Sequence, residues 1–108
     1  MKIEKILYML PRSMDIASRR LGIRTLRESE LTVLYVIKNS PFLPGKTAIH
    51  RHLQRFKHPA AYVTVHHACN WLLEVGLIER IGTKYSLSYR GKDYLQCVRR
   101  YLVYQRLT

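Results

Sequence analysis

The segment from Val65 to Leu95 constrains the fold more than any other part of the sequence. Apolar residues at helical spacing run up to Gly76, and glycine commonly ends a helix in the left-handed conformation. Two short apolar segments then flank Gly82-Thr83, a pair typical of a tight β-hairpin turn. A second helical stripe follows Ser88, which is a good N-cap residue. The segment therefore predicts a helix, a two-stranded hairpin and another helix, in that order.

Further helices are expected upstream, and each has a local signal at one end. Pro11 is expected to stop the first helix, and Ser13 and Ser29 are expected to cap the second and third. Phe42–Gly45 reads as an extended link or one short strand, and Pro59 suits the start of a helix. The expected helices are Met1–Leu10, Met14–Leu21, one from Ser29 to Asn39, Thr47 or Lys46 to Phe56, Ala60–Val75 and Tyr89–Arg106, and the expected strands are Leu77–Ile81 and Lys84–Leu87.

This order predicts the fold class, which is mainly α with a small β-hairpin (α+β). Two helices joined by a short turn and followed by a hairpin indicate a winged helix-turn-helix. With 108 residues the chain fits one small domain. We expect an N-terminal helical extension at residues 1–27, a winged-helix domain at 28–95 and a C-terminal helix at 88–108.

The charge of the chain points to a polyanionic partner. Nineteen Lys and Arg residues against seven Asp and Glu residues give a net charge of +12 at pH 7. The excess is spread along the chain, but from Leu31 to Leu73 there is no acidic residue. A surface that faces phosphates needs such an absence, because each carboxylate would repel the nucleic acid. Nucleic acid is therefore the expected partner, ahead of an anionic membrane surface.

Two short motifs carry a resemblance to a known family. Trp71–Arg80 (WLLEVGLIER) and Tyr85–Leu95 (YSLSYRGKDYL) resemble the two signatures that flank the wing of winged-helix transcription regulators, MarR-type and PadR-type proteins among them. The similarity covers about residues 28–95. It implies sequence-specific binding of double-stranded DNA by a transcriptional regulator. The hairpin turn of two residues is shorter than the wing of MarR-type proteins.

Candidate DNA contacts follow from the geometry of a helix in the major groove, whose N-terminal part meets the base edges. The inner stripe of helix 60–75 is expected to be Val65, Ala68 or Cys69, and Leu72. The expected outward residues are Tyr62, Thr64, His66, His67 and Asn70. Asn70 suits bidentate reading of adenine, and Thr64 suits a phosphate or a thymine methyl group. The expected phosphate contacts are Lys46, Arg51, Arg55 and Lys57, and the expected contacts of the wing are Arg80, Thr83 and Lys84.

Other site types have little support in the sequence. The cysteines Cys69 and Cys97 form no CxxC motif, so we expect free thiols in a reducing, cytoplasmic compartment. Five histidines lie between His50 and His67, but neither close pair has the spacing of helical metal ligands. No paired carboxylates, nucleotide-binding motif or spanning segment stands out. We therefore expect no enzyme activity, cofactor, metal, small-molecule ligand or membrane association.

The last helix carries more apolar residues than a terminal helix of a small domain needs: Tyr94, Leu95, Val98, Tyr101, Leu102, Val103 and Tyr104. We therefore expect a homodimer formed through the terminal helices. The alternative is that the first helix covers this surface within one chain. Two alternatives to a regulator also remain, a winged-helix protein-interaction module and a sequence-neutral nucleic-acid-binding accessory protein.

Overall fold

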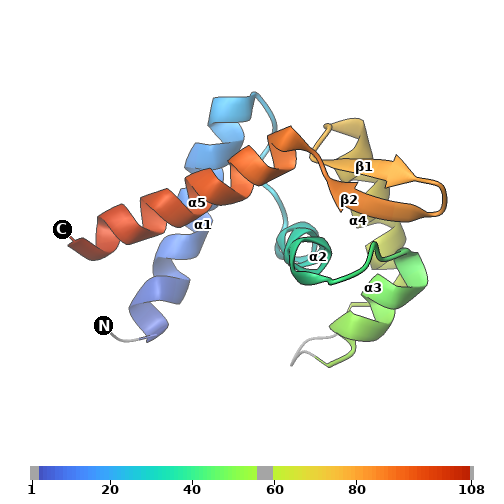
Figure 1. Ribbon diagram of the computed structural model, residues 1–108. Helices are drawn as coiled ribbons and strands as arrows, with labels where there is room; N and C mark the ends of the chain where they lie inside the picture. Colours follow the sequence, from blue (N-terminus) through green and yellow to red (C-terminus); the bar gives the residue numbers. More distant parts are fainter. Residues whose placement is uncertain (1–2, 56–59, 108) are drawn as a thin grey trace. The chain divides into compact units, whose positions relative to one another are not determined.

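The computed structural model describes the backbone of residues 3–55 and 60–107 and the side chains of residues 12–55 and 60–100. Its elements, in chain order, are α1 (Ile3–Leu21), α2 (Glu28–Asn39), α3 (Lys46–Leu53), α4 (Tyr62–Glu74), β1 (Ile78–Ile81), β2 (Lys84–Leu87) and α5 (Tyr89–Leu107) (Figure 1). The predicted fold class, mainly helical with one small hairpin, is confirmed.

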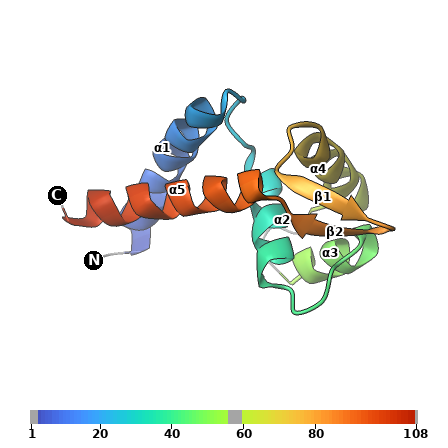
Figure 2. The ribbon, with the colours of Figure 1, turned by 45° about the horizontal axis from the view of Figure 1, so that its top comes forward.

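The chain divides into two compact units. Residues 27–91 form what we call the hairpin unit, and residues 1–26 with 92–108 form the helical-pair unit. In the hairpin unit, α4 contacts α2, α3 and β1, and the hairpin lies alongside α4 (Figures 1 and 2). The core side chains of this unit include Leu31, Val33, Leu34, Ile37, Ile49, Leu53, Val65, Ala68, Cys69, Leu72, Leu77, Ile78 and Tyr85. The inner stripe predicted for α4 is therefore confirmed.

Two glycines shape the hairpin as predicted. Gly76 has a φ of 80° directly after Val75, the C-cap residue of α4, and Gly82 has a φ of 64° in the turn. Both angles lie in the left-handed region that favours glycine. The strands pair antiparallel, from Ile78 opposite Leu87 to Ile81 opposite Lys84. The two-residue turn fixes this register, so the side chain of Tyr85 points into the core.

The start of α5 is bound tightly to the end of α4. Ser88 accepts a hydrogen bond from the backbone N–H of Gly91 at 3.0 Å, which confirms the predicted cap. Arg90 Nε donates to the carbonyl of Val75 at 2.9 Å, where the C-terminal carbonyls of α4 lack helical partners. Gly91 lies so close to the Leu77 carbonyl oxygen that a Cβ atom at this position would overlap it.

Three predicted boundaries in the hairpin unit are wrong. Ser29 does not cap α2, because the carboxylate of Glu30 accepts from the N–H of Arg27 at 2.7 Å and the helix starts at Glu28. α3 ends at Leu53 instead of Phe56, and α4 starts at Tyr62 instead of Ala60. Between the two helices, the side-chain amide of Gln54 donates to the backbone carbonyl of Ala60 at 2.8 Å. This hydrogen bond links the C-terminal end of α3 to the residue that precedes α4 by two positions. Phe56 and Pro59 lie outside the described residues.

The extended link before α3 is confirmed, but it forms no strand. The N–H of Tyr85 donates to the carbonyl of Pro44 at 2.9 Å. At Gly45, a Cβ atom would lie 3.2 Å from the carbonyl oxygen of Thr83. These close approaches hold the N-terminal turn of α3 against the hairpin.

In the helical-pair unit the prediction of two short helices is wrong. α1 is continuous from Ile3 to Leu21 and passes through Pro11, although proline lacks one helical hydrogen bond. Ser13 is fully buried within this helix and starts no new one. The packing of the following turns explains the continuity, since Met14 and Ala17 are buried. Tertiary burial outweighs the local effect of the proline here.

Polar contacts tie α1 to α5 within this unit. The hydroxyl of Ser18 donates to the carbonyl of Met14 at 2.7 Å and lies 3.3 Å from the hydroxyl of Tyr94, both side chains being buried. Arg20 forms an ion pair with Asp93 at 3.8 Å. The side chains of residues 101–104, to which the sequence assigns a role in dimerisation, lie outside the described residues.

Candidate nucleic-acid interface

α4 presents one face to the core and the opposite face to solvent. None of the five side chains predicted to face outward is buried: Tyr62, His67 and Asn70 are exposed, and Thr64 and His66 are partly exposed. The exposed face therefore carries an aromatic ring, two imidazoles, an amide and a hydroxyl. This set offers donors, acceptors and a flat apolar surface together.

Sequence reasoning missed one residue of this face. Val63 is 58% exposed and lies one turn before His67. The spacing gives the signal that identifies it, because residues 63, 67 and 70 share a side once Val65, Ala68 and Cys69 point inward. A solvent-exposed apolar side chain at the start of α4 adds a surface suited to an apolar group such as a thymine methyl.

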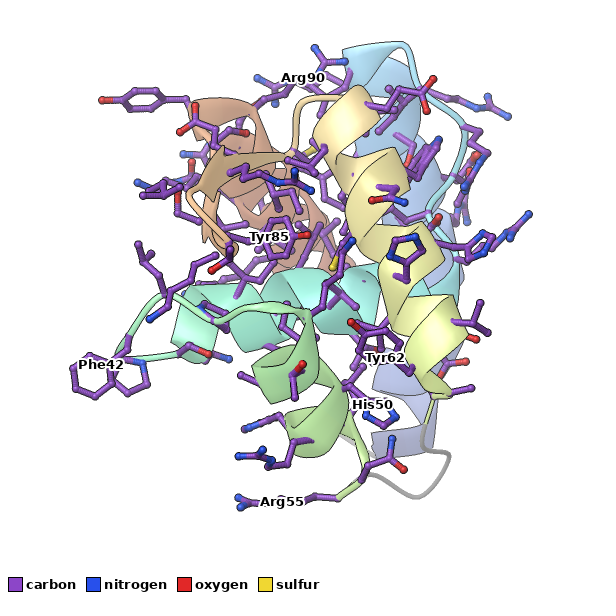
Figure 3. The ribbon with its side chains drawn as sticks, turned by 90° about the vertical axis from the view of Figure 1, so that its right-hand side faces the viewer. Phe42, His50, Arg55, Tyr62, Tyr85 and Arg90 are labelled. Atoms are coloured by element: carbon purple, nitrogen blue, oxygen red, sulfur yellow. The ribbon has the colours of Figure 1, made fainter. Side chains whose placement is uncertain are left out.

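Several polar side chains of α4 are held by contacts with α3 and with each other. Lys46 Nζ lies 2.7 Å from His66 Nδ1, and the Nε2 atom of the same ring lies 3.2 Å from the amide of Asn70. His50 and Tyr62 meet edge to face, with ring centroids 5.6 Å apart (Figure 3). These contacts orient three of the predicted side chains, Tyr62, His66 and Asn70.

A groove of about 600 Å³ lies between the start of α3, the start of α4 and the hairpin. Its lining residues are Gly45, Lys46, Thr47, Ala48, Arg51, Tyr62, Arg80, Gly82, Thr83 and Tyr85. The structure thus brings together predicted contacts that the sequence separates by about thirty residues. Three of the lining side chains are cationic and none is acidic, so the groove is basic.

Two arginines, Arg51 and Arg80, line the groove. Within the described residues, neither Arg51 nor Arg80 forms an ion pair with an acidic side chain. The guanidinium of Arg80 lies 5.9 Å from the ring centroid of Tyr85, at the range of a cation–π contact. α3 also begins here, after its N-cap residue Gly45, and no side chain of the described residues caps its first N–H groups. Both features favour an anion in the groove.

Two predicted cations, Arg55 and Lys84, are not among the residues that line this groove. Arg55 is exposed beyond the end of α3 and points away from the body of the unit (Figure 3). Lys84 is exposed on β2, where it pairs with Ile81 outside the groove lining. Lys57 lies outside the described residues.

Cys69 is a core residue, as the sequence favours. Burial raises the pKa of its thiol to about 11, although nearby Lys46 acts in the opposite direction. Across the described residues, no group of three or more His, Cys, Asp or Glu side chains is arranged to hold a metal ion. Over the same part of the chain, no helix is long and apolar enough to span a membrane.

Comparison with known proteins shows the fold of the chain, although the sequence identity to the matching structures is low. No protein-family model matches the chain, and a search of curated proteins finds no match either. Two crystal structures of the MarR family protein Rv2887 of Mycobacterium tuberculosis do match. The first has a TM-score of 0.62 at 17% identity, over 93% of this chain and 70% of that one. The second, a complex with DNA, has a TM-score of 0.61 at 18% identity, over 94% and 77%. The chain therefore has the winged-helix fold of MarR-like proteins.

Proposed function

We propose that the protein binds double-stranded DNA sequence-specifically and acts as a transcriptional regulator. The observation that carries the proposal is the acid-free basic groove beside the exposed face of α4, within one winged-helix unit. One of the structural neighbours is a complex with DNA, which supports the same partner. In this arrangement α4 enters the major groove of the duplex, and phosphates lie along α3 and the hairpin.

Each part of the surface has a separate task in this proposal. Thr64, His67 and Asn70 meet base edges, with Val63 against an apolar part of a base. Arg51 and Arg80 hold a backbone phosphate in the groove, with Thr83 at its rim. Arg55, Lys57 and Lys84 contact phosphates further along the duplex. Phosphate contacts fix the register of the protein, and base contacts supply specificity.

A homodimer completes the proposal. Winged-helix dimers place two recognition helices on half-sites about one turn of DNA apart. The terminal helices, residues 1–27 and 88–108, form the dimer contact in this scheme. Analytical ultracentrifugation at several protein concentrations tests it, and a monomer at all concentrations contradicts it.

The decisive experiment is selection of bound fragments from a random duplex library at ~0.15 M salt. A regulator should enrich a motif and discriminate it from other sequences by ~10³-fold or more. A palindrome with half-sites about 10 base pairs apart would support the dimer. Binding without enrichment would favour a sequence-neutral accessory protein. No retained DNA would favour a protein-interaction module, since the basic groove would then serve another partner.

A further inference from the structure

Three side chains connect the basic groove to the exposed face of α4. Lys46 lines the groove, His66 lies between the two helices, and Asn70 lies on the exposed face one turn further along α4. Lys46 Nζ is 2.7 Å from His66 Nδ1, and His66 Nε2 is 3.2 Å from Asn70 Nδ2. A continuous polar chain thus joins a candidate phosphate contact to a candidate base contact.

The first link determines the state of the imidazole. A lysine ammonium has three N–H donors and no acceptor. The close contact with Nδ1 is therefore a hydrogen bond only if Nδ1 carries no proton and accepts. In a neutral imidazole the other nitrogen then carries the proton. Lys46 thus selects the Nε2–H tautomer of His66.

The second link determines the orientation of the Asn70 amide. The Nε2–H of His66 is a donor in this tautomer, so its partner must be an acceptor. The amide nitrogen, which is the nearer atom here, only donates. The nitrogen and oxygen of the amide are nearly equal in size, so a rotation of 180° about the Cβ–Cγ bond of Asn70 exchanges their positions. Oδ1 then accepts from Nε2–H, and Nδ2 points toward solvent.

This orientation suits the reading of adenine. Bidentate recognition uses Nδ2 to donate to N7 and Oδ1 to accept from the N6 amino group. One lone pair of Oδ1 is engaged by His66, and the second remains available. An amide fixed in advance avoids the loss of side-chain freedom on binding.

We propose that His66 is a positioning residue, which holds the Asn70 amide through its Nε2–H tautomer, and that Lys46 sets this tautomer. The role at the base rests on the proposed function of DNA binding, whereas the tautomer is a property of the free protein. Lys46 then contributes to specificity as well as to charge, unlike Arg51 in the same groove.

The tautomer is measured by ¹H–¹⁵N correlation NMR of the imidazoles in the uniformly labelled full chain. His66 should show a protonated Nε2 and an unprotonated Nδ1, assigned by their loss in His66→Gln. Lys46→Met should return His66 to a mixture of tautomers. Exposed His67, whose ring centroid is 5.8 Å from that of His66, is the internal control and should behave similarly in both proteins. A protonated Nδ1 in the wild-type protein, or no response to Lys46→Met, overturns the proposal.

The positioning role is measured by library selection with matched variants. Asn70→Ala identifies the base pair that Asn70 reads. In His66→Leu the discrimination at that same base pair should fall about tenfold. His66→Gln should retain most of the preference, because its amide supplies both a donor and an acceptor. Gln96→Ala, at an exposed position of α5, should leave that base pair unaffected. Amide spectra of each variant check its fold.

Each outcome of the selection decides one question. Full preference in His66→Leu, at a base pair where Asn70→Ala loses it, overturns the positioning role. Equal losses in His66→Leu and His66→Gln do the same, since only the hydrogen bonds distinguish these variants. A wild-type protein without sequence preference overturns the proposed function and with it the positioning role. The tautomer result is then still judged by the NMR spectrum alone.

Discussion

The two units of the molecule differ in what two of their arginines contact. In the helical-pair unit, Arg19 and Arg20 form ion pairs with Asp15 and Asp93, at 3.2 and 3.8 Å. In the hairpin unit, the cations around the groove have no acidic side chain to pair with among the described residues. Arginine side chains thus form internal ion pairs in the helical-pair unit, whereas the arginines of the groove in the hairpin unit are available to an anionic partner. Net charge alone does not reveal this difference, because both units are basic.

The largest expected effect concerns stability and contrasts one glycine from each unit. Gly91→Ala places a Cβ atom on the Leu77 carbonyl oxygen. That carbonyl also accepts from the N–H of Ser88, so it cannot move freely. We expect a loss of about 3 kcal/mol in the free energy of unfolding, measured by urea denaturation.

Gly22→Ala in the helical-pair unit is the matched control. Gly22 has a φ of 71°, and no atom lies within 4 Å of the added Cβ. Only backbone strain remains, with an expected loss of about 1 kcal/mol. Equal losses in the two variants would contradict the steric explanation for Gly91.

The second prediction concerns sequence discrimination. Asn70→Ala should reduce discrimination at one base pair by about 1–3 kcal/mol, because a bidentate contact is removed. Gln96→Ala removes an exposed amide from α5 in the other unit and should change nothing. Fluorescence competition with point-mutated duplexes measures both. Unchanged discrimination in Asn70→Ala would remove this residue from the base-reading set.

The third prediction contrasts the two cysteines and depends on pH. The pKa of buried Cys69 is raised from its ordinary value of 9.0 to about 11, chiefly by burial. The resulting stabilisation is complete below pH 9 and is lost as the pH rises toward 11. Between pH 8 and pH 10 the free energy of unfolding should therefore fall by about 1 kcal/mol more in the wild-type protein than in Cys69→Ala. Urea denaturation of both proteins from pH 8 to 10 measures the difference.

Partly exposed Cys97 provides the comparison. At pH 8 a maleimide should modify Cys97 and leave Cys69 unmodified, because burial excludes the reagent and the thiolate is scarce. Mass spectrometry of the intact protein and of its peptides shows which thiol reacts. Equal modification of both cysteines under native conditions would contradict the burial of Cys69.

The fold of the hairpin unit could be predicted from the sequence because its signals are local. Gly76 and Gly82 act through their own φ angles, and Ser88 acts on a neighbouring N–H. The helical-pair unit was harder to predict because Pro11 gives a strong local signal that the packing of α1 overrides. Local rules fail where burial between distant segments decides the conformation.

The candidate site follows the same division. The outward residues of α4 could be predicted because helical spacing separates them from the buried stripe. The groove could not, since Lys46 and Arg80 meet only after α3 and the hairpin have packed. The contact of Lys46 with His66 was equally hidden, because the two residues are 20 positions apart. Lys46 was predicted to contact a phosphate, and no sequence pattern indicates its histidine partner.

The smallest effects should come from single cations, and they test the contrast between the two units directly. Arg51→Ala and Arg80→Ala should each reduce the slope of log affinity against log salt by about 0.9 and weaken binding about fivefold at 0.15 M salt. All duplexes should be affected alike, because a phosphate carries no sequence information.

Arg19→Ala and Arg20→Ala should leave the slope unchanged and alter stability by at most a few tenths of a kcal/mol, since both ion pairs are largely exposed. Affinity measured over a salt series for the four variants separates the two uses of arginine. If the slope falls equally in all four variants, the affinity for DNA depends only on the total charge of the protein. The groove would then have no special role in binding.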